Sequence, residues 1–86
     1  MPEFRFTQEF LKQLARLEPL ADDERNRLEA ALAEIVGNPS HPERFPSHYD
    51  PNDPSYFVRR EPFMIRYSIE AETDTVVFRT LFRRQT

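Results

Sequence analysis

The sequence of 86 residues contains no cysteine and no tryptophan, and Gly37 is its only glycine. Without cysteine the chain has no disulfide, thiol nucleophile or cysteine metal site. A single glycine cannot build a glycine-rich phosphate loop. No apolar run approaches the ~20 residues of a membrane span, and Met1–Pro2–Glu3 lacks the basic start and apolar stretch of a signal peptide. We therefore expect a cytoplasmic protein with no membrane association.

Positive charge is scarce, and it is unevenly distributed along the chain. The 12 basic residues stand against 15 acidic ones, which gives a net charge of −3, and all of the bases except Lys12 are arginine. Residues 1–55 carry 11 acids and 6 bases, whereas residues 56–86 carry 6 arginines and 4 acids. The negative total argues against binding nucleic acid by bulk charge. The last third of the chain nevertheless has a local excess of arginine.

Residues 1–37 are predicted to form a short strand followed by two helices. Glu3–Phe6 alternates polar and apolar residues as a strand does, with Phe4 and Phe6 facing inward, and Thr7 is the expected helix N-cap. Apolar residues at helical spacing then define two amphipathic stripes: Phe10, Leu11, Leu14 and Leu17, and Leu28, Ala31, Leu32, Ile35 and Val36. Gly37 is expected to end the second helix in a left-handed conformation.

The rest of the chain predicts a loop and then a sheet. The proline-rich residues 38–55 are expected to be irregular. From Tyr56 the apolar residues alternate, which predicts strands over 56–59, 63–70 and 75–82 with a turn at 71–74. The expected fold class is α+β in the order β-α-α-β-β-β, an antiparallel sheet with the N-terminal helical hairpin packed on one face. The length indicates a single domain over residues 1–86.

Arginines are the most informative feature of the predicted sheet. They are Arg59, Arg60, Arg66, Arg79, Arg83 and Arg84. A guanidinium group pairs bidentately with phosphate or carboxylate. Because Arg66 and Arg79 project from strands joined by a short turn, we expect them on one face, where they and Arg59 would bind a partner. The alternative is that these arginines are solvated and paired with acids such as Glu70 or Glu72.

The two histidines, His41 and His48, both lie in the proline-rich segment. Their spacing matches no standard metal-ligand pattern, and the run Asp50–Asp53 lacks the alternating oxygens and central glycine of a calcium loop. We therefore expect no metal and no cofactor. Both histidines are expected to be exposed to solvent.

Five short motifs follow one another along the chain: Phe4–Thr7 before a leucine-rich helix, Asn38–Pro39 after a second helix, Pro62–Tyr67, Val76–Phe78 and Phe82–Arg84. In this order they resemble the RelE/ParE superfamily, the toxins of bacterial type II toxin–antitoxin systems. The resemblance implies a small α+β toxin held inactive by a cognate antitoxin. It further implies one of two targets, since RelE-like members cut mRNA on the ribosome and ParE-like members poison DNA gyrase.

The resemblance also implies candidate catalytic residues, in case the chain cuts RNA. RNA cleavage needs basic groups that stabilise phosphate charge and groups that carry protons. Arg59, Arg60, Arg83 and Arg84 fall near positions where such toxins keep basic residues. In a rearranged site, His48 or Tyr49 of the proline-rich segment would carry the proton.

Three positions depart from the pattern of RNA-cutting members. Met64 stands where arginine is usual, Phe82 stands where histidine or another polar residue is usual, and the chain ends at Thr86 without a terminal tyrosine. Methionine and phenylalanine neither donate a strong hydrogen bond nor carry a proton. The sequence therefore favours a ParE-like toxin that binds gyrase. A ribosome-dependent mRNA endonuclease with a rearranged site and a degenerate toxin-fold protein that only binds a partner are the alternatives.

Overall fold

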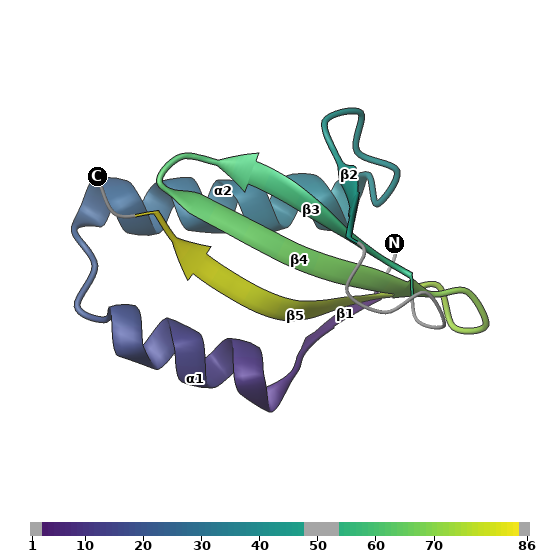
Figure 1. Ribbon diagram of the computed structural model, residues 1–86, viewed down its shortest axis with the longest axis horizontal. Helices are drawn as coiled ribbons and strands as arrows, with labels where there is room; N and C mark the ends of the chain where they lie inside the picture. The colour runs from purple at the N-terminus through teal and green to yellow at the C-terminus, as the bar shows by residue number, and fades with distance from the viewer. Residues whose placement is uncertain (1–2, 48–53, 85–86) are drawn as a thin grey trace.

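The computed structural model describes residues 3–47 and 54–84, and within them the predicted α+β fold is confirmed (Figure 1). Along the chain the elements are β1 (Glu3–Phe6), α1 (Gln8–Leu17), α2 (Asp22–Gly37), β2 (Phe45–Ser47), β3 (Ser55–Arg60), β4 (Phe63–Glu70) and β5 (Thr75–Arg83). The strands form one sheet in the order β1-β5-β4-β3-β2. Strand β4 has the predicted bounds, because its apolar residues alternate without interruption.

The sheet differs from the prediction in two ways. First, β1 pairs with β5 in parallel, so the sheet is mixed rather than antiparallel throughout. Parallel neighbours need a long crossover connection, and here both helices and three strands lie between β1 and β5 in the sequence. Second, the segment predicted to be irregular contributes β2, which pairs with β3 as an edge strand. Proline has no backbone N–H to donate. An edge strand tolerates Pro46 because no second strand lies on its outer side to need that hydrogen bond.

The helix boundaries follow the predicted caps at one end and depart from them at the other. Thr7 is the N-cap of α1, and its hydroxyl accepts a hydrogen bond from the backbone N–H of Phe10 at 3.2 Å. Gly37, however, is the last residue of α2 and has no positive φ. The predicted left-handed conformation is therefore wrong. Asn38 ends the helix instead, with its N–H bonded to Glu34 O at 2.9 Å, before Pro39 prevents a further turn.

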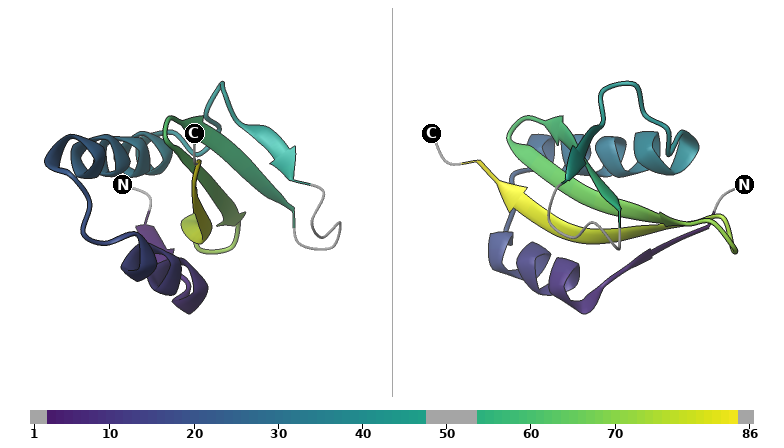
Figure 2. Two further views of the ribbon diagram at one scale, coloured as in Figure 1. Left: turned by 60° about the vertical axis from the view of Figure 1, so that its left-hand side comes forward. Right: turned by 45° about the vertical axis from the view of Figure 1, so that its right-hand side comes forward.

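Both helices pack on the same face of the sheet, with α1 along β5 and α2 against β3 (Figure 2). The core between them contains the fully buried side chains of Phe10, Ile35, Val58, Ile65, Tyr67 and Phe78. Phe4 and Leu11, which were predicted to face inward, are 52% and 48% exposed. Within the described part of the chain, neither helix has the length and apolar character needed to cross a membrane.

Candidate functional site: the open face of the sheet

One face of the sheet is covered by the helices, and we call the other face the open face. Side chains alternate along a strand, and Ile65 and Tyr67 of β4 face the helices. Met64, Arg66 and Ser68, which alternate with them along β4, therefore lie on the open face. The residues of β3 and β5 that pair with these three lie on the same face, as does Phe45 of β2, which pairs with Phe57. The open face includes Phe45, Phe57, Arg59, Met64, Arg66, Ser68, Arg79, Thr80 and Phe82.

A β-bulge brings two of the predicted arginines together on this face. Arg66 pairs with Thr80 and Tyr67 pairs with Phe78, so Arg79 has no opposite residue. The Arg79 side chain reaches the open face, where its Nε donates to Ser68 Oγ at 2.7 Å, while Arg66 Nε donates to Thr80 Oγ1 at 3.1 Å. Arg66 and Arg79 thus share one face as expected, although both are half-buried rather than freely solvated. Their role in partner binding stays a prediction.

Aromatic residues form a row across the open face, and sequence reasoning did not identify it. Phe45 stacks on Phe57 with ring centroids 5.6 Å apart, and Phe57 lies 6.5 Å from Phe82. Phe45 is 42% exposed and Phe82 is 49% exposed. Because β2 was not predicted, nothing in the sequence pattern placed Phe45 beside the other two rings. The row gives the open face an apolar surface of the kind that marks interaction sites.

A pocket lies at the end of this row, where β3, β4 and β5 meet. It has a volume of about 310 Å³ and is lined by Arg59, Glu61, Phe63, Met64, Phe82 and Arg84. Arg84 Nη1 lies 3.0 Å from Glu61 Oε1, and Arg59 Nε lies 3.8 Å from the same oxygen. One carboxylate is therefore shared by two guanidinium groups, so the rim of an apolar pocket keeps a net positive charge.

The four arginines named as catalytic candidates separate into two pairs. Arg59 and Arg84 meet at the pocket, whereas Arg60 and Arg83 reach acidic side chains of the covered side. Arg83 Nε donates to Glu24 Oε2 of α2 at 2.9 Å. The other two candidates, His48 and Tyr49, lie outside the described residues.

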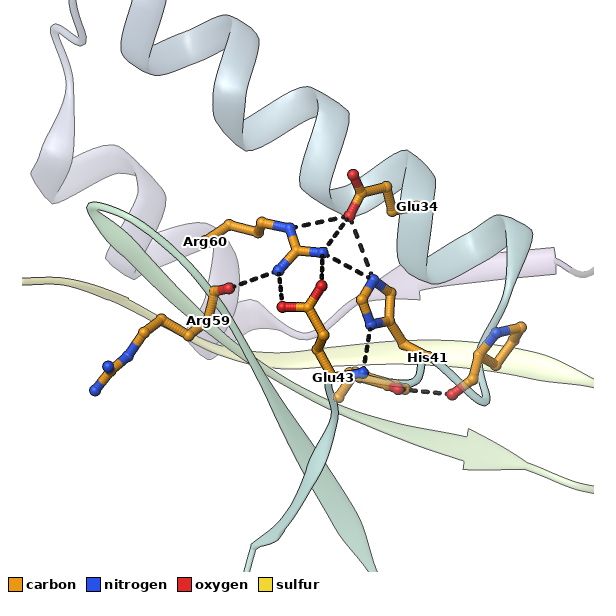
Figure 3. A network of polar contacts seen from close by, with 7 residues as sticks. Glu34, His41, Glu43, Arg59 and Arg60 are labelled. Atoms are coloured by element: carbon orange, nitrogen blue, oxygen red, sulfur yellow. Dashed lines mark hydrogen bonds and ion pairs between the residues drawn. The ribbon is translucent and has the colours of Figure 1, made fainter.

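Arg60 is the centre of a polar network on the covered side (Figure 3). Its Nε donates to Glu34 Oε2 at 3.1 Å, and its Nη1 and Nη2 donate to the two carboxylate oxygens of Glu43 at 3.0 Å each. The hydrogen bond with Glu43 raises the pKa of Arg60, and the same bond lowers the pKa of Glu43. The network ties β3 to α2 and to the segment after it. Arg60 therefore has a structural role on the covered side.

His41 belongs to the same network, and the prediction that it is exposed is wrong. It is only 7% exposed. Its Nδ1 accepts a hydrogen bond from the Glu43 backbone N–H at 3.1 Å, and its Nε2 lies 3.3 Å from Glu34 Oε2 and 3.2 Å from Arg60 Nη2. Since Nδ1 is an acceptor, the neutral ring carries its proton on Nε2 and donates to Glu34. Long-range contacts that no local pattern encodes draw this histidine into the protein.

Residues 3–47 and 54–84 contain no group of three histidine or acidic side chains placed to hold a metal ion. The acids nearest His41 converge on the guanidinium of Arg60 instead. Asp50 and Asp53 of the proline-rich segment lie outside the described residues.

Comparison with known proteins gives one family match. The model of the family described as "ParE toxin of type II toxin-antitoxin system, parDE" matches residues 4–86. Among curated proteins no significant match was found.

Solved structures of RelE toxins share the fold. The isolated RelE toxin of Escherichia coli has a TM-score of 0.74 at 16% identity, covering 100% of this chain and 87% of that one. A chain of the archaeal RelE–RelB complex from Pyrococcus horikoshii has a TM-score of 0.74 at 14% identity, covering 96% of this chain and 94% of that one. The RelBE2 toxin–antitoxin complex of Mycobacterium tuberculosis has a TM-score of 0.66 at 23% identity, covering 96% and 91%. At these identities the likeness is one of fold.

Proposed function

Since the chain belongs to the family of ParE toxins of type II toxin–antitoxin systems, within the RelE/ParE superfamily, we propose that it arrests growth by binding a protein target, DNA gyrase, through the open face. It does so without cutting RNA, and a cognate antitoxin neutralises it. The observation that carries this proposal is the lining of the pocket at the end of the open face.

Phe63, Met64 and Phe82 line that pocket between Arg59 and Arg84. RNA cleavage needs groups that move protons to and from the reacting oxygens, with a pKa near the working pH. Apolar side chains cannot do this, and arginine keeps its proton at any physiological pH. The only titratable acid of the pocket, Glu61, is held by two arginines. The described residues of this pocket are therefore suited to binding a partner and include no group that could carry a proton in RNA cleavage.

The antitoxin is proposed as the partner that covers the same face. Support comes from the structural relatives, of which two are toxins in complex with their antitoxins. The charge of the open face supports an acidic or amphipathic antitoxin segment, because Arg59, Arg66 and Arg79 lie on it. An antitoxin in this place would neutralise the toxin by excluding its target.

The alternative function is ribosome-dependent cleavage of mRNA. It is favoured by the same arginines, since guanidinium groups also pair with phosphate. Under this alternative the proton carrier would be His48 or Tyr49, which lie outside the described residues.

The two functions differ in whether DNA synthesis or protein synthesis stops first. Expression of the toxin without its antitoxin, followed by pulse labelling with thymidine and leucine, separates them. Binding of gyrase predicts that thymidine incorporation falls before leucine incorporation, because replication depends on gyrase. Earlier loss of leucine incorporation supports the RNA-cutting alternative. Unaffected growth supports a degenerate protein that only binds a partner. A gene with a stop codon at Lys12 is the control for expression itself.

A further inference from the structure

We propose that the pocket between Arg59 and Arg84 is the anchor site for one apolar side chain of the target protein, presented by an acidic segment of that target. This inference rests on the proposed function and names the chemistry that the toxin recognises. It concerns the target rather than the antitoxin.

The lining of the pocket selects an apolar side chain. Met64 of β4 pairs with Phe82 of β5 on the open face, and Phe82 is 49% exposed, so the pocket has an apolar lining with one large aromatic ring open to solvent. Such a ring gains most from being covered by a partner, because its exposed apolar area is removed from water. Binding energy in protein interfaces is concentrated in anchors of this kind.

The rim of the pocket selects negative charge around that side chain. The side chains of Arg59 and Arg84 are 56% and 59% exposed, and both share the single carboxylate of Glu61. The three groups sum to one positive charge, in a chain whose net charge is −3. A carboxylate of the partner would take the place of the shared Glu61 on one guanidinium, and charge complementarity of this type determines orientation and the rate of encounter.

The apolar surface continues beyond the pocket along the aromatic row. Phe57 lies 6.5 Å from Phe82, and Phe45 stacks on Phe57 at 5.6 Å. A segment anchored at Phe82 can therefore extend from β5 across β4 and β3 to β2 along this row of rings. This length of contact favours a polypeptide segment over a small molecule.

A nucleic acid would also stack on exposed aromatic rings, but the pocket fits it less well. The polar edge of a base entering between Met64 and Phe82 would leave hydrogen-bond groups unpaired, which is costly when they are buried. An apolar side chain carries no such groups. The protein ligand is therefore the one that the lining favours.

The test measures gyrase inhibition by variants of the complete toxin. Phe82→Ser removes the exposed ring, and we expect the toxin concentration for half-inhibition of supercoiling to rise about tenfold, the loss typical of an interface anchor. Leu11→Ser is the matched control, because Leu11 is 48% exposed but lies on α1, away from the open face. It should inhibit as the unchanged protein does. Both substitutions are at surface positions, and thermal unfolding confirms that each variant is folded.

A second pair of variants tests the charge of the rim. Arg84→Glu should raise the half-inhibitory concentration about tenfold, and more at low salt than at high salt. Arg16→Glu makes the same charge change at an exposed position of α1 and should have little effect.

The possible outcomes distinguish this inference from the function on which it rests. If the unchanged toxin does not inhibit gyrase, both the proposed function and this inference are wrong. If the unchanged toxin inhibits but Phe82→Ser and Arg84→Glu inhibit equally well, the function stands and the anchor site is wrong. If Phe82→Ser instead loses binding of a labelled 12-nucleotide single-stranded RNA while inhibiting gyrase normally, the pocket serves a nucleic acid and the inference is overturned.

Discussion

The hydroxyl of Tyr67 lies in the core and donates a hydrogen bond to the backbone oxygen of Pro39, 2.6 Å away. Tyr67 is fully buried, and this burial raises the pKa of its phenol, so the group remains a neutral donor. Tyr67→Phe should lower the free energy of unfolding by about 0.5–1.5 kcal/mol, the net contribution of one hydrogen bond, because the carbonyl of Pro39 still accepts from Arg44 Nη1 at 3.1 Å. Urea denaturation measures the loss. Tyr56→Phe is the control because the Tyr56 hydroxyl has no hydrogen bond among the described residues; an equal loss in both variants would contradict the account.

Glu43 is a surface carboxylate whose pKa lies below the ordinary 4.5, chiefly because of its hydrogen bond to Arg60. A carboxyl group with a lower pKa in the folded than in the unfolded state stabilises the fold above the unfolded value, and this stabilisation is lost as the pH falls through the folded pKa. In Glu43→Gln the melting temperature should therefore decline less steeply below pH 4.5 than in the unchanged protein. Melting curves at a series of pH values check this. Glu72→Gln, at an exposed turn position, should keep the steeper decline; a variant at Glu43 that also keeps it would count against the ion pair.

The roles of single arginines were the least predictable part of the candidate site. Sequence reasoning placed six arginines on the sheet, but it did not distinguish Arg59 and Arg84 at the pocket from Arg60 and Arg83 on the covered side. The difference depends on acids far away in the sequence, such as Glu24, 59 residues before Arg83. Periodicity reports which face a residue takes within its own strand. It does not report the acid that another element brings to that face.

Among the elements, the clearest difference from the prediction is the C-terminal end of helix α2. Gly37 lies in its last turn with helical backbone, and a Cβ atom added there would meet nothing within 4 Å. Gly37→Ala should therefore raise the free energy of unfolding by about 0.4–1 kcal/mol, because alanine loses less backbone entropy on folding. Chemical denaturation measures the gain. Destabilisation by this substitution would show that the residue needs the left-handed conformation after all.

Strands β4 and β5 show how far element prediction from the sequence extends. Alternation of apolar residues predicted both strands closely, as it reports burial of one face. It did not predict the bulge at Arg79, which has no paired residue on β4. A bulge is a property of the pairing between two strands and not of one strand's sequence. The parallel pairing of β1 was unpredictable for the same reason. Neighbours in a sheet depend on the whole chain path.

At the scale of the whole molecule, the negative net charge hides two different surfaces. Acids of α2 face the covered side, where they pair with Arg60 and Arg83. The open face carries Arg59, Arg66 and Arg79 beside the aromatic row. The resemblance to a toxin family was recognisable from sequence because its motifs follow these elements in order. The pocket was not recognisable, because its residues come from three strands and from the segments that flank them.

The antitoxin complex tests whether Arg66 and Arg79 bind a partner. Replacing both by alanine should weaken the complex with the cognate antitoxin by more than about 1 kcal/mol if they meet carboxylates in a desolvated interface. Calorimetric titration measures the affinity. Because both side chains also hydrogen-bond within the sheet, the unfolding free energy of the free double variant is the control. Unchanged affinity in a folded variant would place the antitoxin elsewhere.

This toxin is proposed to act by binding gyrase and not by cutting RNA. The most direct measurement is supercoiling of relaxed plasmid by purified gyrase in the presence of a molar excess of antitoxin-free toxin. Supercoiling should stop, and adding the cognate antitoxin should restore it. Full supercoiling activity at that excess would contradict the claim.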